Sequence, residues 1–118
     1  PFCVTGERRL LDAVFSNLLK NAAEASPEGG EITVRLSREG PLAEVFIRNR
    51  GEVPRAVRER FFEKYATAGK ATGTGLGTYS ARLMLRVMGG TLSLNTEEPG
   101  HTTLIVRLPA STGGPSAP

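Results

Sequence analysis

The chain has few of the residues that support redox, zinc or disulfide chemistry. Among its 118 residues there is one cysteine (Cys3), one histidine (His101) and no tryptophan. A single cysteine cannot close an internal disulfide, and a single histidine gives no cluster of the soft ligands that zinc requires. These scarcities argue against a disulfide-stabilised scaffold and against a transition-metal centre.

Long hydrophobic runs and a strong charge bias are also missing. No segment approaches the roughly 18 to 20 apolar residues of a membrane span. The first residues also lack the charged, apolar and small-residue regions that follow one another in a secretory signal peptide. The net charge of +3 suits an anionic ligand, but Lys and Arg form no clustered stripe of the kind that binds nucleic acid. We therefore expect a cytoplasmic protein, or the cytoplasmic piece of a membrane-bound one, with no direct membrane contact.

What the chain does contain is typical of one globular domain. Its length fits a single core of about 100 to 150 residues, and 39% hydrophobic with 23% charged residues is an ordinary composition. Residues 110–118 hold only small residues, glycine and proline, which cannot bury enough apolar surface to order themselves. We expect a domain over residues 1–109 and a disordered tail over 110–118.

The spacing of apolar residues predicts the elements. Helical periodicity covers Glu7–Ala25, Pro54–Lys64 and Tyr79–Met88. Alternation predicts strands at Glu31–Ser37, Leu42–Arg48, Thr91–Asn95 and Thr102–Leu108, with an extra short strand at Phe2–Val4. This order predicts an α/β (α+β) two-layer sandwich, in which three helices cover one face of a mixed, mostly antiparallel sheet of about five strands.

A loop rich in glycine and threonine, Tyr65–Gly77, precedes the last helix. Glycines at a helix start let backbone N–H groups approach phosphate oxygens, and the helix dipole favours negative charge there. Taken alone, such a cluster is about as often a plain flexible connection. It is not a Walker loop, because Lys70 precedes Gly73 and the glycines after it instead of following them.

Two asparagines four residues apart, Asn17 and Asn21, project from the same face of the first long helix. Asparagine has a poor helix propensity, and a buried amide needs hydrogen-bond partners. Those partners can be backbone groups or a bound ion, and carbonyl oxygens suit Mg²⁺. The residues alone leave structural amides and a ligand site both open.

In order along the chain, these motifs resemble the conserved boxes of sensor histidine kinases. The segment Asn17–Ala22 is similar to the N box, and Gly73–Gly77 is similar to the G2 box. Arg60–Tyr65 resembles the intervening F box, and Asn49–Pro54 lies where the G1 box belongs. The resemblance covers about residues 2–109 and implies the Bergerat ATP-binding fold, which type II topoisomerases, heat-shock chaperones and mismatch-repair ATPases share.

The resemblance also implies the ligands and their residues. It implies ATP and Mg²⁺, with Asn21 on the metal, Asn17 beside it near the phosphates, and Lys70 reaching the phosphates from the lid. Asn17, Asn21 and Lys70 are thus the candidate catalytic residues. The full set of candidate nucleotide-binding residues is Asn17, Lys20, Asn21, Asn49, Gly51, Val53, Lys70, Gly73, Thr74, Gly75, Leu76, Gly77 and Thr103.

The chain departs from the family pattern in the G1 box. The family usually has Asp-x-Gly-x-Gly there, whereas this chain has Asn49, Gly51 and Val53, without the second glycine. The usual Asp accepts a hydrogen bond from the adenine amino group. An Asn carbonyl can also accept one, but without charge assistance, so we expect weaker recognition of adenine. Asn49 is alternatively a turn-forming residue at a strand end.

A second departure bears on the reaction. The ATP-hydrolysing relatives have a Glu base at the position of Asn17, and an Asn cannot take a proton from water. The resemblance therefore implies phosphoryl transfer, and because His101 lies in a predicted turn, the phosphoacceptor histidine would be on a helical-hairpin domain of the same parent kinase. A response regulator would be an indirect partner. The alternatives are an ATPase or serine kinase of the same fold, or a degenerate module that binds nucleotide or a partner without catalysis.

Overall fold

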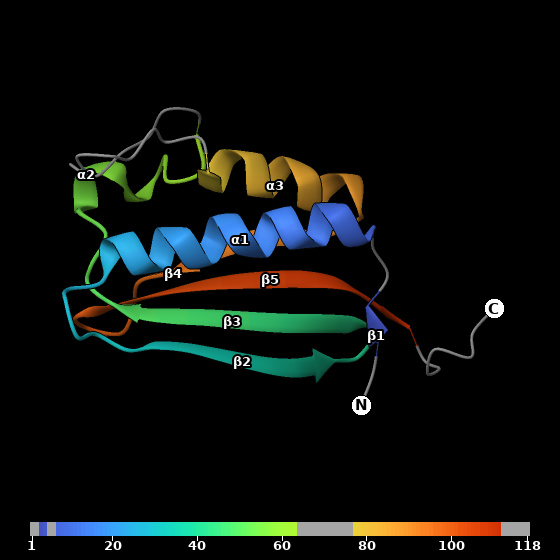
Figure 1. Ribbon diagram of the computed structural model, residues 1–118, viewed down its shortest axis with the longest axis horizontal. Helices are drawn as coiled ribbons and strands as arrows, with labels where there is room; N and C mark the ends of the chain where they lie inside the picture. The colour runs from blue at the N-terminus through green and yellow to red at the C-terminus, as the bar shows by residue number, and fades with distance from the viewer. Residues whose placement is uncertain (1–2, 5–6, 64–76, 112–118) are drawn as a thin grey trace.

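The computed structural model places a layer of helices over one face of a β-sheet (Figure 1), and it describes residues 3–4, 7–63 and 77–111. The helices are α1 (Arg8–Ala25), α2 (Arg55–Arg58) and α3 (Gly77–Val87). The strands are β1 (Cys3–Val4), β2 (Ile32–Glu39), β3 (Leu42–Arg50), β4 (Thr91–Asn95) and β5 (His101–Ser111). The predicted two-layer sandwich with helices on one face is confirmed.

The sheet is organised around β5, which pairs with β1, β3 and β4, while β2 pairs with β3 at one edge. All four pairings among the described strands are antiparallel, so the parallel component that a mixed sheet would need is not found there. The β2–β3 hairpin turns tightly between Glu39 and Leu42, which are partners in the register. Gly40 has a φ of +57° in this turn, a conformation that glycine adopts at little cost.

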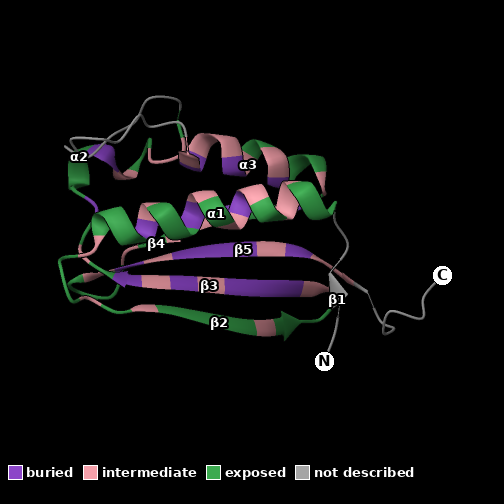
Figure 2. Ribbon diagram, viewed as in Figure 1, coloured by how far each residue is buried: buried purple, intermediate pink, exposed green. Residues whose placement is uncertain are grey.

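The core lies between the two layers (Figure 2). From the helices it receives Val14, Leu18 and Ala22 of α1 and Ala81 and Leu85 of α3, and from the sheet Val45, Ile47, Leu92, Leu104, Val106 and Leu108. The α1 residues are spaced by four, which places them on one helix face, and the β5 residues are spaced by two, which places them on one sheet face. The apolar periodicity of the sequence therefore indicates which side of α1 and of β5 is buried.

The two ends of α1 follow from their capping groups. Glu7 precedes the helix, and its carboxylate accepts hydrogen bonds from the backbone N–H groups of Arg9 and Leu10 at 3.2 and 3.1 Å. At the other end the backbone N–H and the hydroxyl of Ser26 both donate to the carbonyl of Ala22, and Pro27 follows. These contacts satisfy groups that the helix itself leaves unpaired.

The largest differences from the predicted boundaries are at α2 and at the end of β5. The helix predicted over Pro54–Lys64 is a single turn, α2, followed by tighter turns in which the N–H of Arg60 donates to Val57 and that of Glu63 donates to Arg60. At the carboxyl end, β5 continues past the expected domain boundary at Pro109, because Ala110 and Ser111 pair with β1 and the Ala110 N–H donates to the Pro41 carbonyl at 2.8 Å. Residues 112–118 lie outside the described part of the chain.

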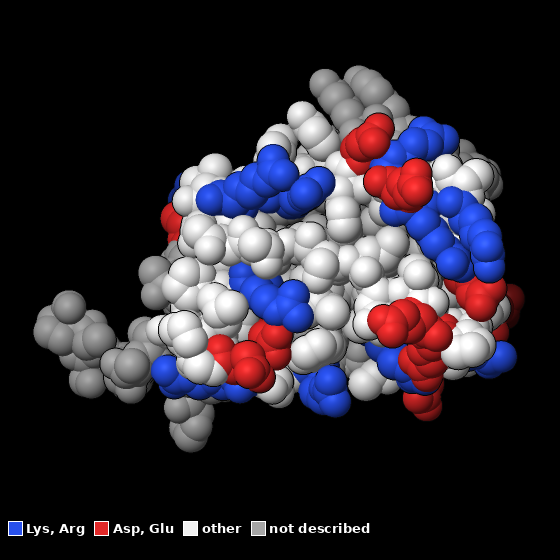
Figure 3. Space-filling view, turned by 180° about the vertical axis from the view of Figure 1, so that it is seen from behind, with Lys and Arg blue, Asp and Glu red and all other residues white. Residues whose placement is uncertain are grey.

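The surface carries both signs of charge. On the face drawn in Figure 3, Lys and Arg side chains form several separate groups, with Asp and Glu side chains beside most of them. Within the residues that the structure describes, no helix has the length and apolarity that a membrane crossing demands.

Candidate functional site

The carboxyl ends of α1 and β3 and the start of β5 come together at one end of the sandwich (Figure 1). Gly51, just after β3, has a φ of +115°, and a Cβ added to it would lie 2.7 Å from the carbonyl oxygen of Ala25, the last residue of α1. That distance is too short for a side chain, so only glycine lets the two backbones meet. The G1-box loop is thereby held against the end of the N-box helix.

The two asparagines of α1 lie on the same helix stripe as this contact. Asn17, Asn21 and Ala25 are spaced by four, and at about 1.5 Å per residue Asn21 is roughly 6 Å and Asn17 roughly 12 Å along the axis from Ala25. Both asparagines are half-buried, each preceding a residue of the buried stripe, whereas Lys20 is exposed. The amides therefore stand at the margin of the core, where a ligand can reach them.

Asn49 lies at the carboxyl end of β3 and is 3% exposed. Its Nδ2 donates to the carbonyl oxygen of Arg50 at 2.7 Å, while its Oδ1 accepts no hydrogen bond from the described residues. Within the described residues, Oδ1 of this buried side chain is thus an acceptor without a donor.

The backbone around Asn49 is fixed by contacts with the turn that precedes β5. Thr102, the register partner of Asn49, donates from its hydroxyl to the Gly51 carbonyl at 2.8 Å. The Gly51 N–H donates to the Gly100 carbonyl at 2.8 Å, and the Gly100 N–H donates to Glu52 Oε2 at 2.7 Å. Both backbone groups of Gly51 are therefore engaged, which fixes the loop that follows Asn49 and β3.

The remaining described candidates lie next to this loop and at the start of α3. Val53 is buried, and its carbonyl accepts a hydrogen bond from Arg58 Nε at 2.8 Å. Thr78 is buried and donates to the Phe61 carbonyl at 3.3 Å, which ties α3 to the F-box segment. Gly77 begins α3. The lid candidates Lys70, Gly73, Thr74, Gly75 and Leu76 lie outside the described residues.

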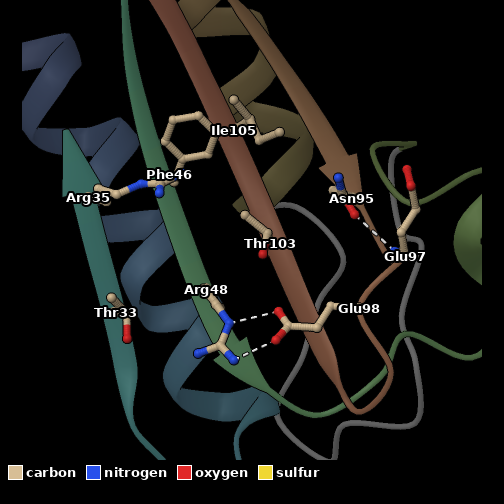
Figure 4. Close-up of a pocket in the computed structure, with 9 residues that line it drawn as sticks. All are labelled: Thr33, Arg35, Phe46, Arg48, Asn95, Glu97, Glu98, Thr103 and Ile105. Carbon is tan, nitrogen blue, oxygen red and sulfur yellow. Dashed lines mark hydrogen bonds and ion pairs between the residues drawn. The ribbon is translucent and has the colours of Figure 1, made fainter. Parts of the chain in front are cut away.

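Thr103 does not join the other candidates. It lies on the helix-free face of the sheet, in a groove of about 450 Å³ that Phe46 and Ile105 also line (Figure 4). Thr102 instead shares the inner face with Asn49. The sequence contained the signal for this, because Leu104, Val106 and Leu108 alternate on the buried face and Thr102 falls in the same phase.

The groove on the outer face is closed at one end by an ion pair (Figure 4). Arg48 Nε and a terminal guanidinium nitrogen donate to the two carboxylate oxygens of Glu98 at 2.8 and 2.7 Å. These hydrogen bonds are the main cause that lowers the pKa of Glu98 below its usual value. The ring of His101 lies beside them, with Nδ1 3.1 Å from the Pro99 carbonyl and 3.7 Å from Glu98.

The oxygen and nitrogen atoms of the described residues do not suit a metal ion held by the protein alone. They fit better a metal ion that is bound jointly by the protein and a ligand. No group of three or more His, Cys, Asp or Glu side chains suited to a metal ion occurs in the described residues. Mg²⁺ characteristically takes one or two protein oxygens together with substrate phosphates. The half-buried amide of Asn21 can supply one such oxygen.

Comparison with known families gives a match over nearly the whole chain. Residues 6–112 match the model described as histidine kinase-, DNA gyrase B-, and HSP90-like ATPase. Among curated proteins, the sensor protein IrlS of Burkholderia pseudomallei is 31% identical over 91% of this chain, and the signal transduction histidine-protein kinase/phosphatase MprB of Mycobacterium sp. (strain KMS) is 36% identical over 90%. The matches cover only 24% and 22% of those two proteins.

Solved structures give the same result at the level of the fold. The mycobacterial sensor histidine kinase MprB superposes with a TM-score of 0.85 and 30% identity, covering 93% of this chain and 78% of that chain. A nucleotide-free catalytic domain of the histidine kinase ThkA superposes with a TM-score of 0.78 and 29% identity, covering 90% of this chain and 70% of that chain.

Proposed function

Because the chain belongs to the family of histidine kinase-, DNA gyrase B- and HSP90-like ATPases and is an ATP-binding catalytic domain of the sensor histidine kinase type, we propose that it donates the γ-phosphoryl group of ATP to a histidine outside this chain. The acceptor would lie on a helical-hairpin domain of the same parent protein. A response regulator would then take the phosphoryl group from that histidine.

The observation that carries the proposal is the meeting of three elements at one end of the sandwich. The Gly51–Ala25 approach sets the loop that follows Asn49 against the end of α1, the helix that carries Asn21 and Asn17. We assign the base to the Asn49 end and the phosphates to the asparagines of α1. The lid candidates, with Lys70 among them, would complete the phosphate end.

Each residue has a chemical task in this assignment. Asn49 Oδ1 would accept a hydrogen bond from the exocyclic amino group of adenine, and Asn21 would supply an oxygen to Mg²⁺. The metal, when bound, neutralises charge on the phosphate oxygens, and transfer then depends on positioning and electrostatic stabilisation. Asn17 cannot accept a proton from water, which favours transfer to a separate acceptor over hydrolysis.

A first experiment measures binding by titration calorimetry, using the whole chain and a non-hydrolysable ATP analogue with Mg²⁺ or with EDTA. We expect binding that depends on Mg²⁺. In Asn21→Ala the dissociation constant should rise at least about tenfold, which is the scale of one charge-assisted contact. Asn95→Ala, an exposed asparagine at the end of β4, is the matched control and should bind as the unaltered chain does. Absence of any binding would leave the degenerate module as the better description.

A second experiment tests the direction of transfer. The chain is incubated with γ-labelled ATP, alone and with the helical-hairpin domain of its parent protein. We expect negligible phosphate release by the chain alone and acid-labile, base-stable label on the added domain. Release by the chain alone that Asn17→Ala abolishes would support the ATPase alternative, and a hairpin domain that never becomes labelled would contradict the kinase assignment.

A further inference from the structure

The side chain that we assign to the base differs in hydrogen-bonding character from the usual one. A carboxylate offers only acceptors, whereas the amide of Asn49 offers an acceptor at Oδ1 and two N–H donors at Nδ2. The contact to Arg50 decides which end is held by the protein. Because the Arg50 carbonyl can only accept, the nitrogen faces it at 2.7 Å, and the oxygen takes no part in this contact.

Other polar groups nearby are already engaged. The N–H and carbonyl of Gly51 bond to Gly100 and Thr102, and the carboxylate of Glu52 accepts from Gly100. These four residues are thus tied to one another. Among the described residues of this cluster, Asn49 is the one with a side-chain amide, and its Oδ1 accepts from none of them. Under the proposed function, this amide takes part in recognising the purine edge.

Charge is the second difference. A carboxylate in a buried place attracts an amino group and repels a carbonyl oxygen, since both of its oxygens are negative and neither carries a proton. A neutral amide repels an oxygen much less. By rotating about χ2, the Asn49 amide can also direct its nitrogen toward a purine oxygen, but it then loses the hydrogen bond to the Arg50 carbonyl.

We propose that Asn49 makes this site permissive toward the exocyclic group of the purine, so that it takes the amino nucleotide ATP and the oxo nucleotide inosine triphosphate with similar affinity. The proposal rests on the proposed function, in which Asn49 contacts the base. The amino form keeps the advantage of one neutral hydrogen bond, which corresponds to a roughly 2- to 13-fold preference. An Asp at this position would restore discrimination by charge.

The test compares the dissociation constants of Mg-ATP and Mg-ITP by calorimetry. The two nucleotides differ at the exocyclic group and in the proton on the adjacent ring nitrogen, and inosine adds no further substituent. For the unaltered chain we expect a ratio of the two constants within about tenfold. For Asn49→Asp we expect the ratio to rise by a further factor of about ten or more, as charge assistance roughly doubles the strength of the contact.

Two further variants keep the test decisive. Asn95→Asp introduces the same chemical change at an exposed asparagine and should leave the ratio unaltered. If Asn49→Asp does not fold, Asn49→Ala serves in its place: it should weaken both nucleotides and bring their ratio close to one. Folding of each variant is checked by its thermal melt.

The possible outcomes distinguish failure of this inference from failure of the proposed function. If ATP binds and inosine triphosphate binds more than about a hundredfold more weakly, or if no Asn49 variant alters the ratio, the permissive role is wrong while the ATP site stands. If neither nucleotide binds the unaltered chain, the proposed function fails and the inference fails with it.

Discussion

Gly51 shows how one residue can hold a site together. Its φ of +115° and the 2.7 Å approach of an added Cβ to the Ala25 carbonyl both exclude a side chain. We predict that Gly51→Ala lowers the free energy of unfolding by about 1 to 3 kcal/mol, the usual cost of a strained backbone conformation. Denaturant unfolding monitored by circular dichroism measures it.

Gly77 is the matched control for that substitution. It begins α3, and a Cβ added to it would meet nothing within 4 Å. Gly77→Ala should change the free energy of unfolding by less than about 1 kcal/mol, because alanine is the better helix former. Equal losses in the two variants would mean that the contact with Ala25 is not the reason for a glycine at position 51.

The ion pair of Arg48 and Glu98 gives a prediction in pH. The hydrogen bonds from Arg48 lower the pKa of Glu98, so the pair's contribution is complete above the usual pKa of a glutamate and is lost as pH falls through the lowered value. In Arg48→Gln the pKa of Glu98 should rise toward its usual value. NMR titration of the side-chain carbonyl carbon measures it, and an unchanged midpoint would contradict the assigned cause.

Among the elements, α1 and β2 contribute very differently to the core. The middle of α1 is buried, with Leu18 fully inaccessible, whereas β2 is an edge strand whose Leu36 is 69% exposed although it points to the helix side. Figure 2 shows β3 and β5 as mostly buried and β2 as mostly exposed. An apolar residue in a regular pattern is therefore no guarantee of burial.

That contrast predicts unequal effects of two leucine substitutions. Leu18→Ala should cost about 2 to 5 kcal/mol, since it removes packed methyl groups and leaves a cavity. Leu36→Thr should change stability by less than about 0.5 kcal/mol, because the site is exposed and threonine suits a strand. Chemical denaturation of both variants decides between this expectation and a buried role for Leu36.

At the scale of the whole molecule, β5 connects the site to the opposite end of the sheet. Its start carries Thr102 beside Asn49, and its last two residues pair with β1. We predict that a chain ending at Pro109 melts lower than one ending at Ser111, by roughly 4 °C for a loss of about 1 kcal/mol. Differential scanning calorimetry measures the difference.

The chain that ends at Ser111 also tests whether residues 112–118 are a disordered tail. A chain ending at Ser111 should melt at the same temperature as the full chain, because residues 112–118 contain little apolar surface to bury. A lower melting temperature for the Ser111 chain would place part of the tail in the fold. Identical melts for chains ending at Pro109 and Ser111 would mean that the β1–β5 pairing contributes nothing measurable.

Local pattern predicted most of the architecture. The three- and four-residue spacing of Leu11, Val14 and Leu18 predicted α1, and the alternation of Leu104, Val106 and Leu108 predicted β5 and its buried face. The same alternation identifies Thr102 as the threonine beside Asn49, whereas the candidate nucleotide-binding residues included Thr103 instead. Where pattern and structure agree, the reason is that burial of one face repeats with the period of the element.

By itself, the sequence determined the elements, the two layers and the family, because periodicity and motif order are properties of residues close together along the chain. Only the tertiary structure decided the contacts that build the site. The approach of Gly51 to Ala25 and the hydrogen bond between Gly51 and Gly100 join positions 26 and 49 residues apart, and the extension of β5 depends on a strand at the other terminus. Such contacts arise from how the elements pack against one another, which no local pattern encodes.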